Sequence, residues 1–136
     1  MLDCGRGRSR GIRVDRPQAL AAEARHDRKY GIVAGYATFG DWRPHSGYRH
    51  TVEHSVYVRE GQRGRGIGKA LMIELIHRAR TLGKHVMVAA IESSNTGSII
   101  MHKRLDFMQV GRMPQVGAKF DRWLDVVLMQ RALGAR

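Results

Sequence analysis

The sequence predicts a single domain of the α/β (α+β) class, built on a mixed central sheet flanked by helices. Between residues 51 and 105, stretches with strand character alternate with two stretches of helical periodicity, and two further strand-like stretches follow. Strands separated by helices favour parallel pairing, whereas two consecutive strands favour a hairpin. A length of 136 residues with 43% hydrophobic and 26% charged side chains is typical of one globular domain.

The elements before residue 51 have the weakest patterns. The segment Gly5–Gly11 consists of glycine, arginine and one serine and resembles a flexible basic arm. Pro17 and the alanine-rich run to Ala24 predict a short helix, because proline suits a first helical turn and alanine favours helix. The β-branched and aromatic run Ile32–Phe39 predicts a strand, which the polar and aromatic loop Trp42–His50 follows.

The later elements follow clear periodicities. Alternation over Thr51–Val58 places Val52 and His54 on one face of a strand and Glu53 on the other. The next element is an amphipathic helix that ends at Gly83, with an apolar stripe at Ile67, Leu71, Leu75, Ala79 and Leu82. The remaining predictions are a strand over Lys84–Ile91, a helix over Asn95–Leu105 and strands over Phe107–Met113 and Trp123–Gln130.

The chain is strongly basic, with a formal net charge of +12 from 24 Lys and Arg against 12 Asp and Glu. This charge favours a polyanionic partner, and DNA, RNA and a phosphorylated small molecule are all candidates. No apolar run approaches the roughly 18–20 residues of a membrane helix, and no secretory signal is recognisable, so we expect a soluble, cytoplasmic protein. Cys4 is the single cysteine, which excludes an intramolecular disulfide and a multi-cysteine zinc site. Sites made of His and carboxylates remain open, but no metal is predicted.

A basic, glycine-rich turn, Arg63–Gly68, lies between the strand that ends at Val58 and the following helix. Glycines let backbone N–H groups approach a ligand closely, and a helix start adds unpaired donors and positive potential. The turn therefore suits a pyrophosphate. It is not a Walker loop, because Lys69 is not followed by Ser or Thr, and not the dinucleotide fingerprint, because the helix has begun by the third glycine.

This turn resembles the Q/R-x-x-G-x-G/A coenzyme A loop of the GNAT N-acetyltransferases. From about Tyr30 to Gln130 the chain is similar to the phosphinothricin/methionine sulfoximine (L-amino acid) acetyltransferase branch of that superfamily. The resemblance implies the GNAT fold and acetylation of the α-amine of a small amino acid or analogue, such as methionine sulfoximine, methionine sulfone or phosphinothricin. The segments that carry it are Gly35–Ala37, Gly40–Pro44, Thr51–Val58, Gly83–Ala89, Met113–Gly117 and Trp123–Asp125.

The resemblance also implies acetyl-CoA as co-substrate. Asn95 matches an asparagine that meets the coenzyme near its reactive end, although a plain helix N-cap is the alternative interpretation. The pantetheine arm is expected on the backbone of Val56, Tyr57 and Val58. The pyrophosphate is expected on Gly64, Arg65, Gly66, Ile67, Gly68 and Lys69.

Two candidate catalytic residues follow from the same resemblance. Glu53 is the expected general base, because an amine attacks a thioester only when neutral and a carboxylate can take its proton. A solvated strand carboxylate is the alternative. His102 matches a histidine near the substrate, where it would assist proton transfer or bind substrate, and a surface histidine is the alternative.

The loop residues Arg43, Pro44 and His45 fall where this branch contacts its amino-acid substrate, and an arginine fork suits a carboxylate. A solvated loop arginine is the alternative. His45 stands where an aromatic residue is expected, which leaves substrate preference open. Trp42, Tyr48 and Trp123 either line the substrate-binding site or pack against other side chains without contacting the substrate.

Residues 1–29 do not match the family, so we interpret them as a basic leader and residues 30–136 as the N-acetyltransferase domain. The family's N-terminal strand and helices are accordingly expected to be missing or altered. Asp106 also replaces an expected glycine at the end of the second helix, where a left-handed residue is common. A homodimer is implied by resemblance alone. Two rival hypotheses remain, namely a weakly active coenzyme A-binding module and, ranked last, a nucleic-acid binder, for which the sequence lacks spaced aromatic platforms.

Overall fold

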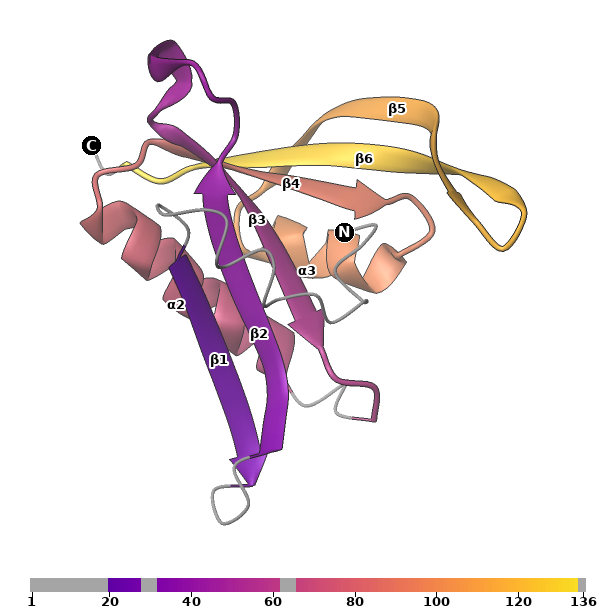
Figure 1. Ribbon diagram of the computed structural model, residues 1–136, viewed down its shortest axis with the longest axis horizontal. Coiled ribbons are helices and arrows are strands. Elements are labelled where there is room, and N and C mark those ends of the chain that lie inside the picture. The colour runs from indigo at the N-terminus through magenta and orange to yellow at the C-terminus, as the bar shows by residue number, and fades with distance from the viewer. Residues whose placement is uncertain (1–19, 28–31, 62–65, 135–136) are drawn as a thin grey trace.

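The computed structural model describes residues 20–27, 32–61 and 66–134, which form one six-stranded sheet and two α-helices (Figure 1). The sheet order is β1-β2-β3-β4-β6-β5, and every neighbouring pair is antiparallel except β3 and β4. The predicted mixed α/β fold, with parallel pairing in the middle and a hairpin at the end, is therefore confirmed. The elements are β1 (Leu20–Asp27), β2 (Ile32–Asp41), the 3-10 turn η2 (Ser46–Tyr48), β3 (Thr51–Val58), α2 (Ile67–Thr81), β4 (Val86–Glu92), α3 (Thr96–Arg104), β5 (Met108–Lys119) and β6 (Arg122–Ala132).

Strand β1 corrects two expectations about the N-terminal region. The helix predicted from Pro17 to Ala24 is wrong from Leu20 onward, because Leu20–Asp27 pairs antiparallel with β2. Sheet pairing overrides helix propensities, which differ by less than about 1 kcal/mol per residue. The sheet consequently has a strand on the outer side of β2, where a missing strand was expected. Residues 1–19, including Cys4 and Pro17, lie outside the described residues.

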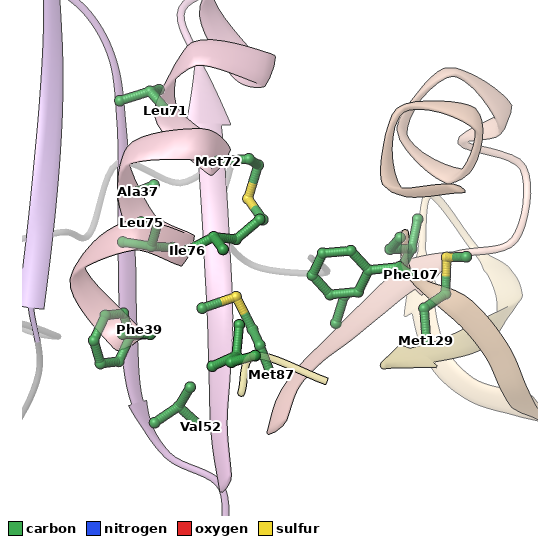
Figure 2. Close-up of a cluster of buried hydrophobic side chains, with 14 of the residues drawn as sticks. Ala37, Phe39, Val52, Leu71, Met72, Leu75, Ile76, Met87, Phe107 and Met129 are labelled. Carbon is green, nitrogen blue, oxygen red and sulfur yellow. The ribbon is translucent and has the colours of Figure 1, made fainter. Parts of the chain in front are cut away.

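The core lies between the sheet and α2, which packs against β1, β2 and β3. Val52, predicted on the face of β3 opposite Glu53, points toward this core, and Figure 2 shows it near Phe39 of β2 and Met87 of β4. The helix contributes the buried residues Leu71, Met72, Leu75, Ile76 and Ala79, which confirms most of the predicted apolar stripe. Leu82 is exposed because it is the C-cap, and Gly83, at φ +80°, follows it as the predicted helix stop.

The β5–β6 hairpin extends away from the rest of the molecule (Figure 1). Both strands are longer than predicted, and the register shifts between Met113 and Gly117. Gln115 has a φ of +57° in this bulge, where its N–H donates to Asp125 Oδ1 over 2.9 Å. The hairpin is joined to α3 through Asp106, whose φ of +70° confirms the left-handed residue expected there.

Candidate active site

Strands β3 and β4 run side by side for only part of their length. They are in parallel register at Thr51–Val86, Val52–Met87 and Glu53–Val88. Beyond this last pair, which we call the branch point, β3 continues to Val58 and β4 to Glu92 with no further pairing between them in the described residues. In Figure 1 the arrowheads of β3 and β4 point away from each other. We call this separation of the two strand backbones the opening, because the groups of β3 that face β4 there have no strand partner among the described residues.

The backbone of β3 beyond the branch point is oriented toward this opening. At the two ends of the β2–β3 ladder, Trp42 N–H donates to Thr51 O and Arg59 N–H donates to Ala34 O. Antiparallel hydrogen bonding alternates along a strand, so the odd-numbered residues of β3 bond to β2. Val56 and Val58 therefore turn their N–H and C=O groups toward the β4 side. These two residues fit the predicted backbone contact with the pantetheine arm, whereas the backbone of Tyr57 faces β2.

Glu53 lies at the branch point itself. It pairs with Gly40 of β2 on one side and with Val88 of β4 on the other, and its side chain is half-buried. Because adjacent residues of a strand point to opposite faces, its carboxylate projects from the face opposite Val52 and α2. The structure thus places a carboxylate where the two strands separate.

The start of α2 follows β3 and completes one side of the opening. Its N-cap Gly66 has a φ of +76°, and no side chain caps this end. The first-turn N–H groups of Ile67, Gly68 and Lys69 therefore lack intrahelical acceptors, as at any helix start, and no acidic residue occurs in the turn. Such an end attracts a phosphate group. Gly64 and Arg65, which were predicted to join them, lie outside the described residues.

Asn95 lies at the N-terminus of α3, just after β4. Its Oδ1 accepts a hydrogen bond from Ser98 N–H over 3.2 Å, so the N-cap interpretation is confirmed. The side-chain NH2 is left without a hydrogen bond to the described residues, and a coenzyme contact stays a prediction. Glu92 supports the preceding turn, because hydrogen bonds from the hydroxyl and backbone N–H of Ser94 lower the pKa of its carboxyl.

The predicted substrate loop lies between β2 and β3. Arg43 stacks its guanidinium 4.4 Å from the Trp42 ring centroid and donates to Trp42 O. Trp42 also meets Tyr48 edge to face, with ring centroids 5.4 Å apart. Pro44 and His45 are exposed. The loop therefore has an ordered aromatic base that presents an arginine, and Trp123 of β6 has no ring contact with it among the described residues.

His102 is fully buried, so the interpretation as a surface histidine is wrong. Its Nδ1 lies 2.7 Å from Ser98 O, and its Nε2 lies 2.9 Å from Nε2 of His54 in β3. His54 projects from the face opposite Glu53, so the structure does not join the two predicted catalytic side chains. Burial lowers the pKa of both histidines, and for His54 the proximity of His102 lowers it further. The sequence placed His54 only on the same strand face as Val52, and its unusual polarity among valines was the available signal.

Metal ligation has no candidate in the residues that the structure describes, since no three His, Cys, Asp or Glu side chains cluster there. No helix within 66–134 or the other described ranges has the length and apolarity to cross a membrane. The arrangement instead offers backbone donors, a helix N-terminus and one carboxylate along a single opening. These groups can bind an extended phosphorylated ligand and accept a proton from a nucleophile.

Comparisons with known proteins agree with this geometry. The model of the acetyltransferase (GNAT) family matches residues 6–107, which reaches into the segment interpreted as a leader. The L-methionine sulfoximine/L-methionine sulfone acetyltransferase of Pseudomonas aeruginosa is 63% identical over 100 residues, which cover 74% of this chain and 58% of that protein. The phosphinothricin N-acetyltransferase of Alcaligenes faecalis is 42% identical over 106 residues, covering 77% of this chain and 54% of the relative.

A solved structure is also similar to this chain in sequence and fold. The Salmonella typhimurium protein yncA, determined with its cofactor acetyl-CoA, aligns with a TM-score of 0.75 and 55% identity. The alignment covers 78% of this chain and 61% of that one. The chain thus spans little more than half the length of the curated relatives it matches.

Proposed function

Because the chain belongs to the acetyltransferase (GNAT) family, we propose that it transfers an acetyl group from acetyl-CoA to the α-amine of a small amino acid or analogue. Methionine sulfoximine, methionine sulfone and phosphinothricin define the proposed substrate class, since relatives at 63% and 42% identity carry those names. The observation that carries the proposal is the branch point, where Glu53 lies beside a β3 backbone directed at the opening.

Coenzyme binding follows from two groups of backbone atoms. Val56 and Val58 offer N–H and C=O groups to the amides of a pantetheine arm. The start of α2, with Lys69 in its first turn, meets the pyrophosphate with partial and full positive charge. These residues fix the coenzyme along β3, so that its reactive end points toward the branch point.

The chemistry requires one proton acceptor from the chain. Acetyl-CoA supplies an acetyl group activated as a thioester, and an amine attacks it only in the neutral form. Glu53 takes the proton from the amine, directly or through a water molecule. Both ring nitrogens of His102 already have hydrogen-bond partners, Nδ1 in Ser98 O and Nε2 in His54. This favours Glu53 as the group that meets the amine. Transfer is direct, within a complex of both substrates, and forms no covalent enzyme intermediate.

The acceptor is proposed to bind on the side of the loop between β2 and β3. Arg43 offers a guanidinium to the substrate carboxylate, and its stacking on Trp42 limits the conformations it loses on binding. Pro44 and His45 flank it on the exposed side of the loop. This contact would orient the α-amine toward Glu53.

A homodimer is the proposed assembly, and the β5–β6 hairpin is the surface that supports it. β5 is an edge strand of the sheet. Its hairpin exposes Phe120 to 85% and Trp123 to 69%, and further apolar side chains along it are exposed at Met108, Val110, Met113 and Val116. An apolar row on an edge strand favours association with another chain. Sedimentation velocity of the full chain tests this, and a monomer at all concentrations would contradict it.

The transfer reaction is tested by incubating the full chain with acetyl-CoA and a panel of amino acids and analogues while following thiol release. We expect release with at least one member of the proposed substrate class. Calorimetric binding of acetyl-CoA without release for any amine would support the weakly active binding module instead. Retention of DNA or RNA that falls steeply with salt and survives saturating acetyl-CoA would support the nucleic-acid binder.

A further inference from the structure

A pair of buried histidines links β3 to α3. His54 is 2% exposed and His102 is fully buried, and their rings are nearly parallel, with an interplanar angle of 9° and centroids 5.0 Å apart. Their Nε2 atoms are 2.9 Å apart, which is a hydrogen-bond distance. Phe107 contacts both rings edge to face, so an aromatic side chain also packs against the pair.

The surrounding acceptors fix the direction of this hydrogen bond. Ser98 O accepts from Nδ1–H of His102 over 2.7 Å, because a carbonyl oxygen has no proton to donate. A neutral imidazole carries one N–H, so Nε2 of His102 must be the acceptor of the pair. His54 therefore donates through Nε2–H. Its Nδ1 is then an unprotonated nitrogen, buried and without a hydrogen-bond partner.

The hydrogen bond between His54 and His102 lies immediately beyond the branch point. The last register pair of β3 with β4 is Glu53–Val88, and His54 is the next residue of β3. From this residue onward β3 has no strand partner on its β4 side among the described residues. The side chain of His54 reaches α3 instead, the helix that follows β4 and carries Asn95 at its N-cap. The hydrogen bond thus connects β3, on one side of the opening, to the helix that follows β4, the strand on its other side.

We propose that His54 is a positioning residue, which holds β3 beyond the branch point at a fixed distance from α3 through its hydrogen bond to His102. This inference rests on the proposed function, since the two elements are those that carry the predicted contacts of acetyl-CoA. His54 touches neither substrate. It acts by fixing the Val56 and Val58 backbone on one side and the start of α3 on the other.

The link can be observed directly in the wild-type chain. The nitrogen chemical shifts of the two imidazoles, measured at neutral pH, report which nitrogen carries the proton. We expect the Nε2–H tautomer for His54 and the Nδ1–H tautomer for His102. A Nδ1–H tautomer on His54, or a charged ring on either residue, would overturn the proposal without any substitution.

The functional consequence is measured with His54→Leu, which removes the donor and leaves Nε2 of His102 unpaired, and with His54→Gln, which keeps an N–H donor. Val52→Ala is the matched control, because Val52 is buried on the same face of β3 but lies within its paired segment. We expect His54→Leu to weaken acetyl-CoA binding about tenfold and His54→Gln to recover most of the loss. Val52→Ala should lower the melting temperature and leave the dissociation constant of acetyl-CoA unchanged.

Two results of this comparison overturn the proposal. One is an unchanged dissociation constant in His54→Leu, and the other is equal weakening by Val52→Ala at the same loss of melting temperature. If His54→Leu does not fold, His54→Gln and the tautomers decide the question. Binding of acetyl-CoA without acetylation of any amine would contradict the proposed function and leave the His54 comparison valid, whereas absence of binding by the wild type would contradict both.

Discussion

Glu53 and Val88 form the last register pair between the two parallel strands of the sheet, and the strands separate immediately beyond them. A carboxylate therefore lies where the two strands diverge, which is where the reactive end of acetyl-CoA is proposed to lie. Its neighbour His54 projects to the opposite face and is bound to His102 of α3. Of these two consecutive residues, Glu53 therefore points toward the proposed reaction. His54 points to the opposite face, where its hydrogen bond connects β3 to α3.

Substitution of Gly35 tests whether the backbone of β3 contacts the coenzyme. A Cβ at this position would lie 2.6 Å from Tyr57 O and 3.2 Å from Leu71 Cδ1, so Gly35→Ala must displace β3 from β2. We expect a loss of stability of about 1–3 kcal/mol and weaker acetyl-CoA binding, because Val56 and Val58 flank Tyr57. Chemical unfolding and calorimetry measure the two effects.

The matched control is Gly111→Ala in β5, where a Cβ would meet its nearest neighbour, Leu128 Cδ1, at an ordinary 3.8 Å. This variant should bind acetyl-CoA like the wild type. Equal binding by Gly35→Ala and the wild type would show that the β3 backbone does not contact the coenzyme.

Asn95 allows its two predicted roles to be separated. Asn95→Asp keeps the oxygen that accepts from Ser98 N–H, and a carboxylate suits a helix N-terminus, so stability should be retained. The substitution removes the side-chain NH2, and we expect weaker acetyl-CoA binding. Asn95→Ala should lose both binding and about 1 kcal/mol of stability. If Asn95→Asp binds acetyl-CoA as tightly as the wild type, Asn95 is an N-cap and nothing more.

The histidine pair predicts how stability depends on pH. Burial depresses the pKa of His54 and His102 in the folded chain below the ordinary value of 6.5, so the unfolded chain binds more protons once the pH falls to that value. Stability should therefore be constant with respect to this pair above about pH 7 and decrease toward acid, by up to about 1.4 kcal/mol per pH unit for each histidine. Ser98 and Phe107, which contact the pair, do not titrate. Urea unfolding at a series of pH values measures the slope.

The double variant His54→Leu/His102→Leu serves as the control for this slope. It removes both titrating groups and leaves no unpaired nitrogen, so the decrease in stability between pH 7 and pH 5 should become smaller. A slope identical to that of the wild type would mean that other groups cause the acid sensitivity.

Sequence patterns predicted the elements with strong periodicity and missed those set by tertiary pairing. The alternation of β3 correctly placed Val52 and Glu53 on opposite faces, and the apolar stripe of α2 correctly predicted that Leu71 and Leu75 are buried. The alanine-rich run before residue 25 indicated a helix, but local propensity is weak beside the ladder that β1 forms with β2. The β5 bulge at Gln115 depends on Asp125, ten residues later, which no local pattern reveals.

The candidate site was predictable in its parts but not in its arrangement. The positions of Glu53 and Gly66 follow from strand alternation and from the glycine-rich turn, and both lie beside the opening. The burial of His102 was not predictable, because its partner His54 is 48 residues away and an exposed helix face was equally consistent with its spacing. Distant side-chain pairing of this kind requires the folded chain.

Glu53 is proposed to accept the proton from the amine during acetyl transfer. Thiol release and acetyl-CoA binding are measured in Glu53→Gln, with Glu74→Gln of α2, whose exposed carboxylate pairs with Arg78, as the control. We predict that Glu53→Gln binds acetyl-CoA like the wild type, that its rate of acetyl transfer is about 10²–10⁴-fold lower, and that Glu74→Gln is unaffected. Equal rates of transfer in Glu53→Gln and the wild type would mean that Glu53 is not the proton acceptor.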